Sequence, residues 1–338
     1  MFFKVIDIDM KFLKKILLFV VSLIVGLALL FGVVEKVGWQ EIVKSFFVFR
    51  WWKALIIIGL TLLRSFFALW KYKLILKADG LEVPIKKIIP SFYSGYPLMF
   101  FAPEFLMSGD FLRGYALQKT EDLPWRKTIG AVVVDRMLDW GVSLITIFLG
   151  VFIFLFRIGL PPKNISLILG GSLLGMGAGL FFLYFKNIRE ESILKLFGVQ
   201  GGKAIEVEEE VHSIFQSGWR RWVMMLFPSA MVGITRVIRI WVLIIFLGET
   251  ISILNSIPLL AFFYLGAGVP IPASLGVHET IQTFAFTKLS LGAGTATAFS
   301  MILRAGELIL ALLGSIALIK IGWNIFRKIL LERLNGNS

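Results

Sequence analysis

The chain contains no cysteine among its 338 residues. A disulfide framework, a thiolate metal site and a cysteine nucleophile are therefore all excluded. Histidine is also scarce, since His212 and His278 are the only two, and a zinc site needs several such ligands. A glycine-rich nucleotide-binding loop with its lysine is missing as well. We therefore expect neither a metal nor another cofactor.

Charged residues make up 17% of the chain, against about 25% in a soluble domain, while 57% are hydrophobic. Several uncharged runs of about 20 residues predict an α-helical protein that crosses a membrane repeatedly. The net charge of +13 comes from Lys and Arg that flank these runs, which favours membrane orientation and anionic lipid over nucleic acid. The first run, 16–34, lacks a small-residue cleavage pattern and is expected to remain as an anchor.

The predicted fold class is all-α and polytopic, with six full transmembrane helices in one integral membrane domain over residues 1–338. The full spans are expected at 16–34, 54–76, 128–156, 164–185, 221–247 and 293–319. Two further apolar stretches, 90–117 and 253–290, are interrupted by helix breakers. The breakers are Pro97, Pro103 and Gly109 in the first stretch and Pro270, Pro272 and Gly276 in the second. We interpret both as broken re-entrant hairpins, and ordinary spans with proline kinks are the alternative.

The loop charges predict the orientation. With both broken stretches returning to their own side, the segments on the N-terminal side carry 22 Lys and Arg, and those on the other side carry 7. This imbalance places both termini and the loop 186–221 in the cytoplasm of the cell membrane. The first hairpin then opens to the cytoplasm and the second to the outside. Repeat one, about 16–156, and repeat two, about 164–319, are therefore expected to be inverted.

Each half contains the same pattern of a proline, an acid seven residues later, and an Arg followed by an acid three residues further on. The acid-to-Arg steps are 26 and 25 residues. Ionised side chains cost about 2.5–3.5 kcal/mol each at the centre of a bilayer, so they usually face a cavity and have a function. The residues of the two copies are Pro103, Asp110, Arg136 and Asp139, and Pro272, Glu279, Arg304 and Glu307.

Two stretches carry a resemblance to a known family. In 95–139 a proline is followed by Gly-Asp-Phe-Leu-Arg and then, on the next helix, by Asp-Arg-Met-Leu-Asp. In 268–307 a Pro-Ile-Pro is followed by Gly-Val-His-Glu and by an Arg 25 residues later. These motifs resemble those of the lysylphosphatidylglycerol synthase transmembrane, flippase-like family, although many relatives have Arg where this chain has His278. The resemblance covers nearly the whole chain.

The resemblance implies lipid handling. Bifunctional synthases of this family carry a soluble aminoacyl-transferase domain after the membrane region, whereas the sequence here continues for about 18 residues after the last span. We therefore expect no aminoacyl transfer by this chain alone. The expected ligand is a membrane phospholipid or a polyprenyl-linked lipid. A membrane-associated glycosyltransferase or lipid synthase is a possible partner.

The predicted site residues are ionised groups within apolar surroundings. Arg113, Arg136 and Arg304 are the candidates for headgroup contact, because a guanidinium binds phosphate through two parallel hydrogen bonds. Every buried cation is expected to be Arg rather than Lys. The acids expected to balance them are Asp110, Asp135, Asp139, Glu279 and Glu307. Weaker candidates are Arg64, Glu104, Arg236, Arg239 and His278. Salt bridges that only hold the repeats together are the alternative interpretation.

Three function classes remain open. A flippase-like protein would bind an anionic or glycosylated lipid headgroup in a central cavity and move it between leaflets. A lipid-modifying transferase could use the acid pairs, but no activated nucleophile or metal motif is present. A non-transporting membrane partner of a glycosyltransferase or lipid synthase is the third class. We expect a transporter rather than an enzyme.

The inverted hairpins are testable because the chain has no cysteine. We expect a membrane-impermeant maleimide to label Phe100→Cys from the cytoplasm and Gly268→Cys from outside. Labelling from the reverse sides, unchanged when lipid is added, would contradict the inverted arrangement.

Overall fold

A computed structural model describes residues 31–32, 34–35, 38–47, 49–101, 108–158, 174, 177–179, 181, 202–216, 218–267, 271 and 276–335. All regular elements in these ranges are helices. They are α2 (Trp39–Phe47), α3 (Trp51–Ala78), α4 (Ile85–Ser94), α5 (Tyr96–Phe101), α6 (Ser108–Glu121), α7 (Trp125–Ile158), α10 (Lys203–Phe215), α11 (Trp219–Phe246), α12 (Ile253–Ala267), α13 (Val277–Lys288) and α14 (Ala293–Asn335).

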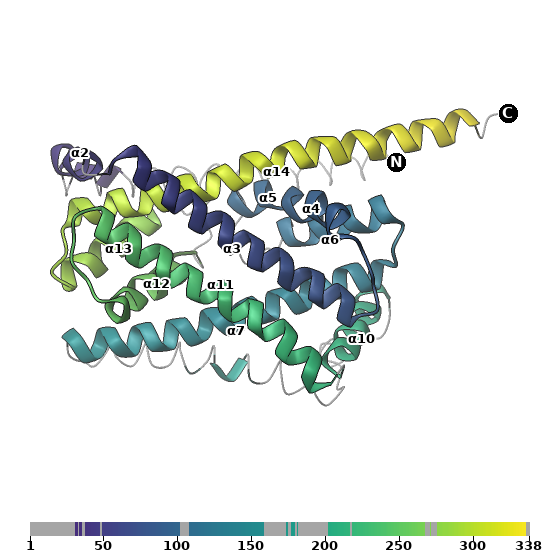
Figure 1. The fold of residues 1–338 in the computed structure, drawn as a ribbon, viewed down its shortest axis with the longest axis horizontal. Coiled ribbons are helices and arrows are strands. Elements are labelled where there is room, and N and C mark those ends of the chain that lie inside the picture. The colour runs from purple at the N-terminus through teal and green to yellow at the C-terminus, as the bar shows by residue number, and fades with distance from the viewer. Residues whose placement is uncertain are drawn as a thin grey trace, which may run out of the picture.

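Four helices are long and apolar enough to cross a membrane, and they match four of the six predicted spans. These are α3, α7, α11 and α14 (Figure 1). α3 and α11 pack against each other and run in opposite directions, and α7 and α14 are also opposed (Figure 1). The other two predicted spans, 16–34 and 164–185, lie almost entirely outside the described residues.

The predicted span 54–76 is confirmed as α3, which continues two residues further to Ala78 and places Lys71 in the interior. Between the predicted spans 16–34 and 54–76 the structure adds the amphipathic helix α2. A helix whose end is covered by neighbouring helices can continue with its polar side chains buried.

The order of long and short helices is the same in both halves. In the first half α3 is followed by the short α4, α5 and α6 and then by α7. In the second half α11 is followed by the short α12 and α13 and then by α14. The packing also corresponds, since α14 contacts α4 and α5 while α7 contacts α12. The short helices of the two halves lie at opposite ends of the molecule (Figure 1).

Glycines allow the long helix of each half to approach the short helices of the other. A Cβ at Gly314 in α14 would overlap the backbone carbonyl of Tyr93 in α4. A Cβ at Gly150 in α7 would overlap the side chain of Ala261 in α12. Close helix approach at small residues is typical of membrane helix packing, where dispersion contacts replace the hydrophobic effect. These contacts join the two halves.

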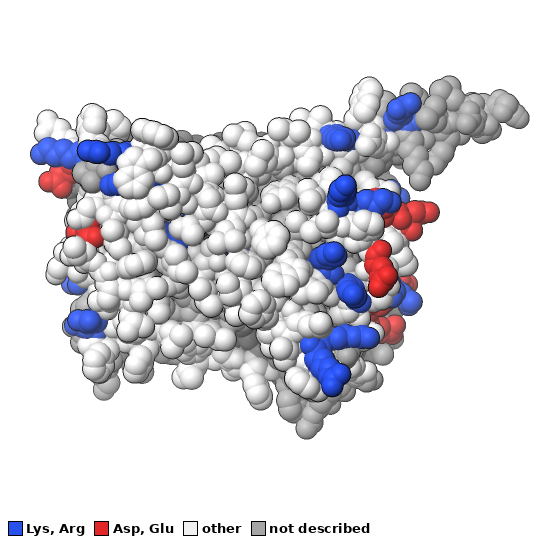
Figure 2. Space-filling view, in the orientation of Figure 1, with Lys and Arg blue, Asp and Glu red and all other residues white. Residues whose placement is uncertain are grey.

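The surface separates charged and uncharged regions. In the view of Figure 2, Lys, Arg, Asp and Glu gather mainly at the two ends of the molecule, and the broad middle is almost entirely uncharged. Exposed apolar side chains such as Phe66, Phe152, Phe227 and Ile316 lie on the long helices. An uncharged surface between two charged ends fits an integral membrane protein.

The helix α10 lies within the segment 186–221 and packs against α7. Asp79, directly after α3, and Glu210 of α10 are both buried at this contact, and Lys127 Nζ lies 3.7 Å from an oxygen of each. Arg126 Nε lies 3.1 Å from Glu210. Burial and the adjacent Glu210 carboxyl raise the pKa of Asp79 to about 8, against the smaller opposing effect of Lys127.

This shifted pKa predicts that stability depends on pH. The folded state keeps the Asp79 proton up to about pH 8, whereas the unfolded chain releases it near pH 3.8, so stability should fall as pH rises between these values. Asp79→Asn, which carries no ionisable proton, should flatten this dependence and raise the unfolding midpoint at pH 8 by roughly 2–4 °C. Thermal unfolding in detergent from pH 5 to 8.5 would measure this. The exposed Asp122→Asn is the control, and equal slopes in all three proteins would contradict the assignment.

Candidate functional site

A cavity of about 200 Å³ lies between the two halves. Side chains of all four long helices line it, together with residues of the short helices of both halves. Six arginines face this space, and they are the six that the sequence places at membrane depth. They are Arg64, Arg113, Arg136, Arg236, Arg239 and Arg304.

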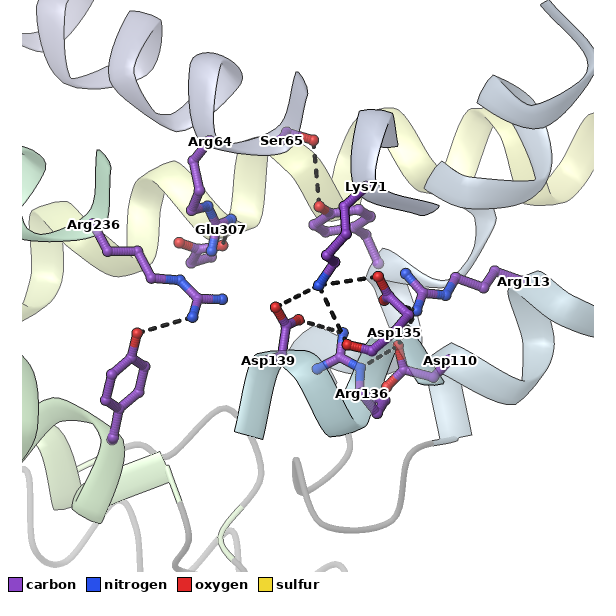
Figure 3. A network of polar contacts seen from close by, with 12 residues as sticks. Arg64, Ser65, Lys71, Asp110, Arg113, Asp135, Arg136, Asp139, Arg236 and Glu307 are labelled. Carbon is purple, nitrogen blue, oxygen red and sulfur yellow. Dashed lines mark hydrogen bonds and ion pairs between the residues drawn. The ribbon is translucent and has the colours of Figure 1, made fainter. Parts of the chain in front are cut away.

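In the first half, three cations and three carboxylates form a closed ring of ion pairs (Figure 3). Lys71 Nζ lies 3.0 Å from Asp135 and 2.6 Å from Asp139. Arg113 contacts Asp135, and lies 3.3 Å from Asp110. Arg136 closes the ring, with Asp110 at 2.8 Å and Asp139 at 3.8 Å. The ring is electrically neutral when every member is ionised.

Helix periodicity explains why these side chains meet. Asp135 and Asp139 are four residues apart on α7, so they share a face of the helix. Lys71 follows Arg64 by seven residues on α3 and also shares its face. Asp110 and Arg113 lie one turn apart near the start of α6. Three helices therefore each direct charged groups at the same point.

Lys71 overturns the expectation that every buried cation is an arginine. Its side chain is 0% exposed, and both of its carboxylate partners lie on α7. Its position seven residues after Arg64 on the predicted span 54–76 was a usable signal, which was missed because Lys71 was counted with the charges at the membrane surface. Tyr72 and Phe92 were also missed, and their rings lie 4.8 and 5.3 Å from the Arg113 guanidinium in cation–π contact.

A second cluster, built from the second half together with Arg64 of the first half, has more arginines than carboxylates among the described residues. Glu307 of α14 bridges Arg64 of α3 at 2.7 Å and Arg239 of α11 at 2.9 Å. Arg304 pairs with the fully buried Glu279 at 2.9 Å. Arg236 donates a hydrogen bond to the Tyr264 hydroxyl at 2.8 Å (Figure 3). This cluster therefore contains four arginines and two glutamates.

Arg64, Arg236 and Arg239 are weaker candidates in the sequence. The structure places all three at the cavity. His278, on α13, also lines the cavity, and its ring stacks on Phe263 with centroids 4.1 Å apart. In the described chain no group of three His, Asp or Glu side chains is arranged to hold a metal ion.

Some of the predicted helix breakers lie at helix ends, and one lies within a helix. Pro97 lies in the first turn of α5, where proline is tolerated, and the break from α4 falls at Gly95. Gly276 precedes α13 with φ +72°. Gly109 was wrongly predicted as a breaker: it is helical, and a Cβ there would overlap the carbonyl of Gly95. Pro103, Glu104, Pro270 and Pro272 lie outside the described residues.

The alternative that these ion pairs only hold the repeats together applies to few of them. The ring joins α3, α6 and α7, which all belong to the first half. Arg304 and Glu279 both belong to the second half. Among the residues that the structure describes, the ion pair between Arg64 and Glu307 crosses between the halves. Most of the charges therefore balance each other within a half while facing the shared cavity.

The fold and the site define an α-helical integral membrane protein with a charged cavity between two sets of helices. A family model described as the lysylphosphatidylglycerol synthase TM region matches residues 18–314. The chain belongs to this family, as its motifs predicted. No curated protein matches the chain.

The ring predicts that removing one charged side chain destabilises the protein more than removing two side chains of opposite charge. Lys71→Met leaves Asp135 and Asp139 buried without their ammonium partner, which typically costs about 3–5 kcal/mol. Lys71→Met combined with Asp139→Asn keeps the ring neutral and should recover part of this loss. Thermal unfolding of the purified protein in detergent would measure both effects.

The exposed pair Lys87 and Glu121 is a matched control, because its atoms are 2.6 Å apart but the lysine side chain is 56% exposed. Its single and double variants should each change stability by about 1 kcal/mol or less. Simple additivity in the Lys71 and Asp139 variants would show that these groups are not coupled.

Proposed function

We propose that this protein binds an anionic or glycosylated lipid headgroup in its central cavity and moves it between the leaflets of the cell membrane. The observation that carries the proposal is the convergence of six arginines from both halves on one cavity. Ionised groups at membrane depth are expensive, and they are typical of substrate pathways. The molecule is proposed to be a transporter and not an enzyme.

The chemistry of arginine supports a headgroup ligand. A guanidinium stays charged at every physiological pH, and it can bind two phosphate oxygens at once. The side chains of Arg136 and Arg304 are 13% and 14% exposed, so they can reach a ligand in the cavity. Arg113 is 2% exposed, and it holds Asp110 and Asp135. We therefore assign direct contact to Arg136 and Arg304 first.

The proposed movement relies on an inverted repeat with two re-entrant hairpins. Two observations support the inverted repeat. The corresponding helices α3 and α11, and likewise α7 and α14, run in opposite directions, and the short helices of the two halves lie at opposite ends of the molecule (Figure 1). In such repeats the substrate site lies at the interface near the midplane, and rocking of the halves exposes it to each side in turn. With the termini in the cytoplasm, α10 and the first hairpin would face the cytoplasm.

Replacing an arginine by lysine keeps the charge but removes the planar fork. We expect Arg136→Lys and Arg304→Lys to fold and insert normally, yet to move fluorescent anionic phospholipid across liposome bilayers at least roughly tenfold more slowly than the parent. The transbilayer rate is measured by dithionite quenching of the outer leaflet.

The control is Arg157→Lys, because Arg157 is exposed near the end of α7, away from the cavity. It should transport as the parent does. If both cavity variants transport lipid as the parent does, these arginines have a structural role and do not bind the headgroup. A parent that moves no lipid would favour a non-transporting partner of a membrane enzyme.

A further inference from the structure

The Glu307 carboxylate bridges one arginine from each half. Its Oε2 atom lies 2.7 Å from Arg64 on α3, and its Oε1 atom lies 2.9 Å from Arg239 on α11. Each carboxylate oxygen therefore accepts from a different guanidinium. Guanidinium groups bind carboxylates and phosphates through the same charge-assisted hydrogen bonds, so two oxygens of one phosphate can take these two positions. The place that Glu307 fills is thus also a place for an anionic headgroup.

Arg239 is held by a second contact that does not involve Glu307. Its terminal nitrogen also donates to Thr61 Oγ1 at 3.1 Å, and the Thr61 hydroxyl donates to the Ile57 carbonyl at 2.8 Å. Gly306 allows α14 to approach α3 here, since a Cβ at this glycine would lie 3.2 Å from Thr61 Oγ1. Thr61 can therefore keep Arg239 in place when the carboxylate moves away.

Glu307 is also the most accessible of the five carboxylates that the structure describes around the cavity. Its side chain is 24% exposed. The side chains of the other four are at most 11% exposed, and they are Asp110, Asp135, Asp139 and Glu279. A carboxylate that faces the cavity can turn away from its partners and leave room for another anion.

Both arginines have a further hydrogen-bond donor that the carboxylate does not use. The Nε atoms of Arg64 and Arg239 are buried and have no hydrogen-bond acceptor among the described residues. The two oxygens of Glu307 already accept from terminal nitrogens of these arginines. A lipid phosphate carries more oxygens than a carboxylate and can accept from more donors at once. The two guanidinium groups therefore suit a phosphate at least as well as they suit Glu307.

We infer that Glu307 is an internal substitute for the headgroup: its carboxylate holds the place between Arg64 and Arg239 that the phosphate of an anionic lipid takes, and it leaves when the lipid binds. This inference rests on the proposed function and adds two arginines to its ligand site. Arg304 lies one turn before Glu307 on α14, so it belongs to the same face of that helix. One anion replaces another, and neither guanidinium is left without a partner.

The exchange has a consequence for both halves. Arg64 belongs to the first half, whereas Arg239 and Glu307 belong to the second. The bound phosphate takes over from Glu307 as the link between them. The released carboxylate remains tethered beside the site and competes with the lipid for the same guanidinium groups. This competition weakens lipid binding and assists lipid release.

The test replaces Glu307 with Gln, which keeps the shape of the side chain and removes its charge. Glu307→Gln should bind dioleoyl phosphatidylglycerol at least roughly tenfold more tightly than the parent, because the internal competitor is gone. Without lipid, its unfolding midpoint should fall by at least roughly 4 °C, since two buried arginines lose their partner, and phosphatidylglycerol should restore it. Lipid binding and thermal unfolding are measured on the purified protein in detergent.

Two further variants separate the position of Glu307 from its charge. Glu307→Asp keeps the charge but is too short to reach both arginines, so it should also bind phosphatidylglycerol more tightly than the parent. Arg64→Gln combined with Glu307→Gln should lose the gain. Glu121→Gln is the control, because this acid pairs with Lys87 at the surface, and it should bind lipid as the parent does.

The remaining results distinguish the inference from the proposed function. Parent-like or weaker binding by both Glu307 variants, with a parent that moves lipid, would overturn the inference and leave the proposed function standing. A gain in Glu307→Gln alone would be an effect of charge and would also overturn it. Tighter binding by both variants, with a parent that moves no lipid, would overturn the transport function and support the inference. Inorganic phosphate that stabilises Glu307→Gln as strongly as phosphatidylglycerol would overturn the lipid part of the inference.

Discussion

The free-energy cost of holding ionised side chains away from water constrains this whole structure. Among the described residues, seven cations and five carboxylates meet between its two halves, and a buried charge without a partner is strongly destabilising. The positions of the helices follow from this need, because α3, α6, α7, α13 and α14 each direct charged residues toward the same space. Around it, apolar cores pack in both halves, and small residues allow the helices to come close.

The two halves balance their charges differently. The first half closes a neutral ring through Lys71, with Arg113 additionally packed against Tyr72 and Phe92. The second half shares the single carboxylate of Glu307 between two arginines. A neutral ring of ion pairs leaves none of its buried charges unbalanced, and guanidinium groups are well suited to bind an anion. The two halves therefore differ in how their charges are paired.

A site that moves lipid must be stable without its ligand, and the ligand must be able to enter it. Internal ion pairs lower the energy of the empty cavity, and an entering phosphate can exchange with a carboxylate at an arginine without stranding a buried charge. The crossing pair Arg64 and Glu307 connects the halves at the cavity itself. A ligand that perturbs this pair would change the contact between the halves, which couples binding to rearrangement.

The sequence by itself determined the membrane class, four long spans, the two broken regions and the arginines of the site. Apolar run length and the cost of intramembrane charge are local properties, so they are readable without a structure. The tertiary structure alone decided which acid pairs with which cation, and it brought Lys71 into the ring. Helices distant in sequence decide whether a lysine near the end of an apolar run meets water or two aspartates.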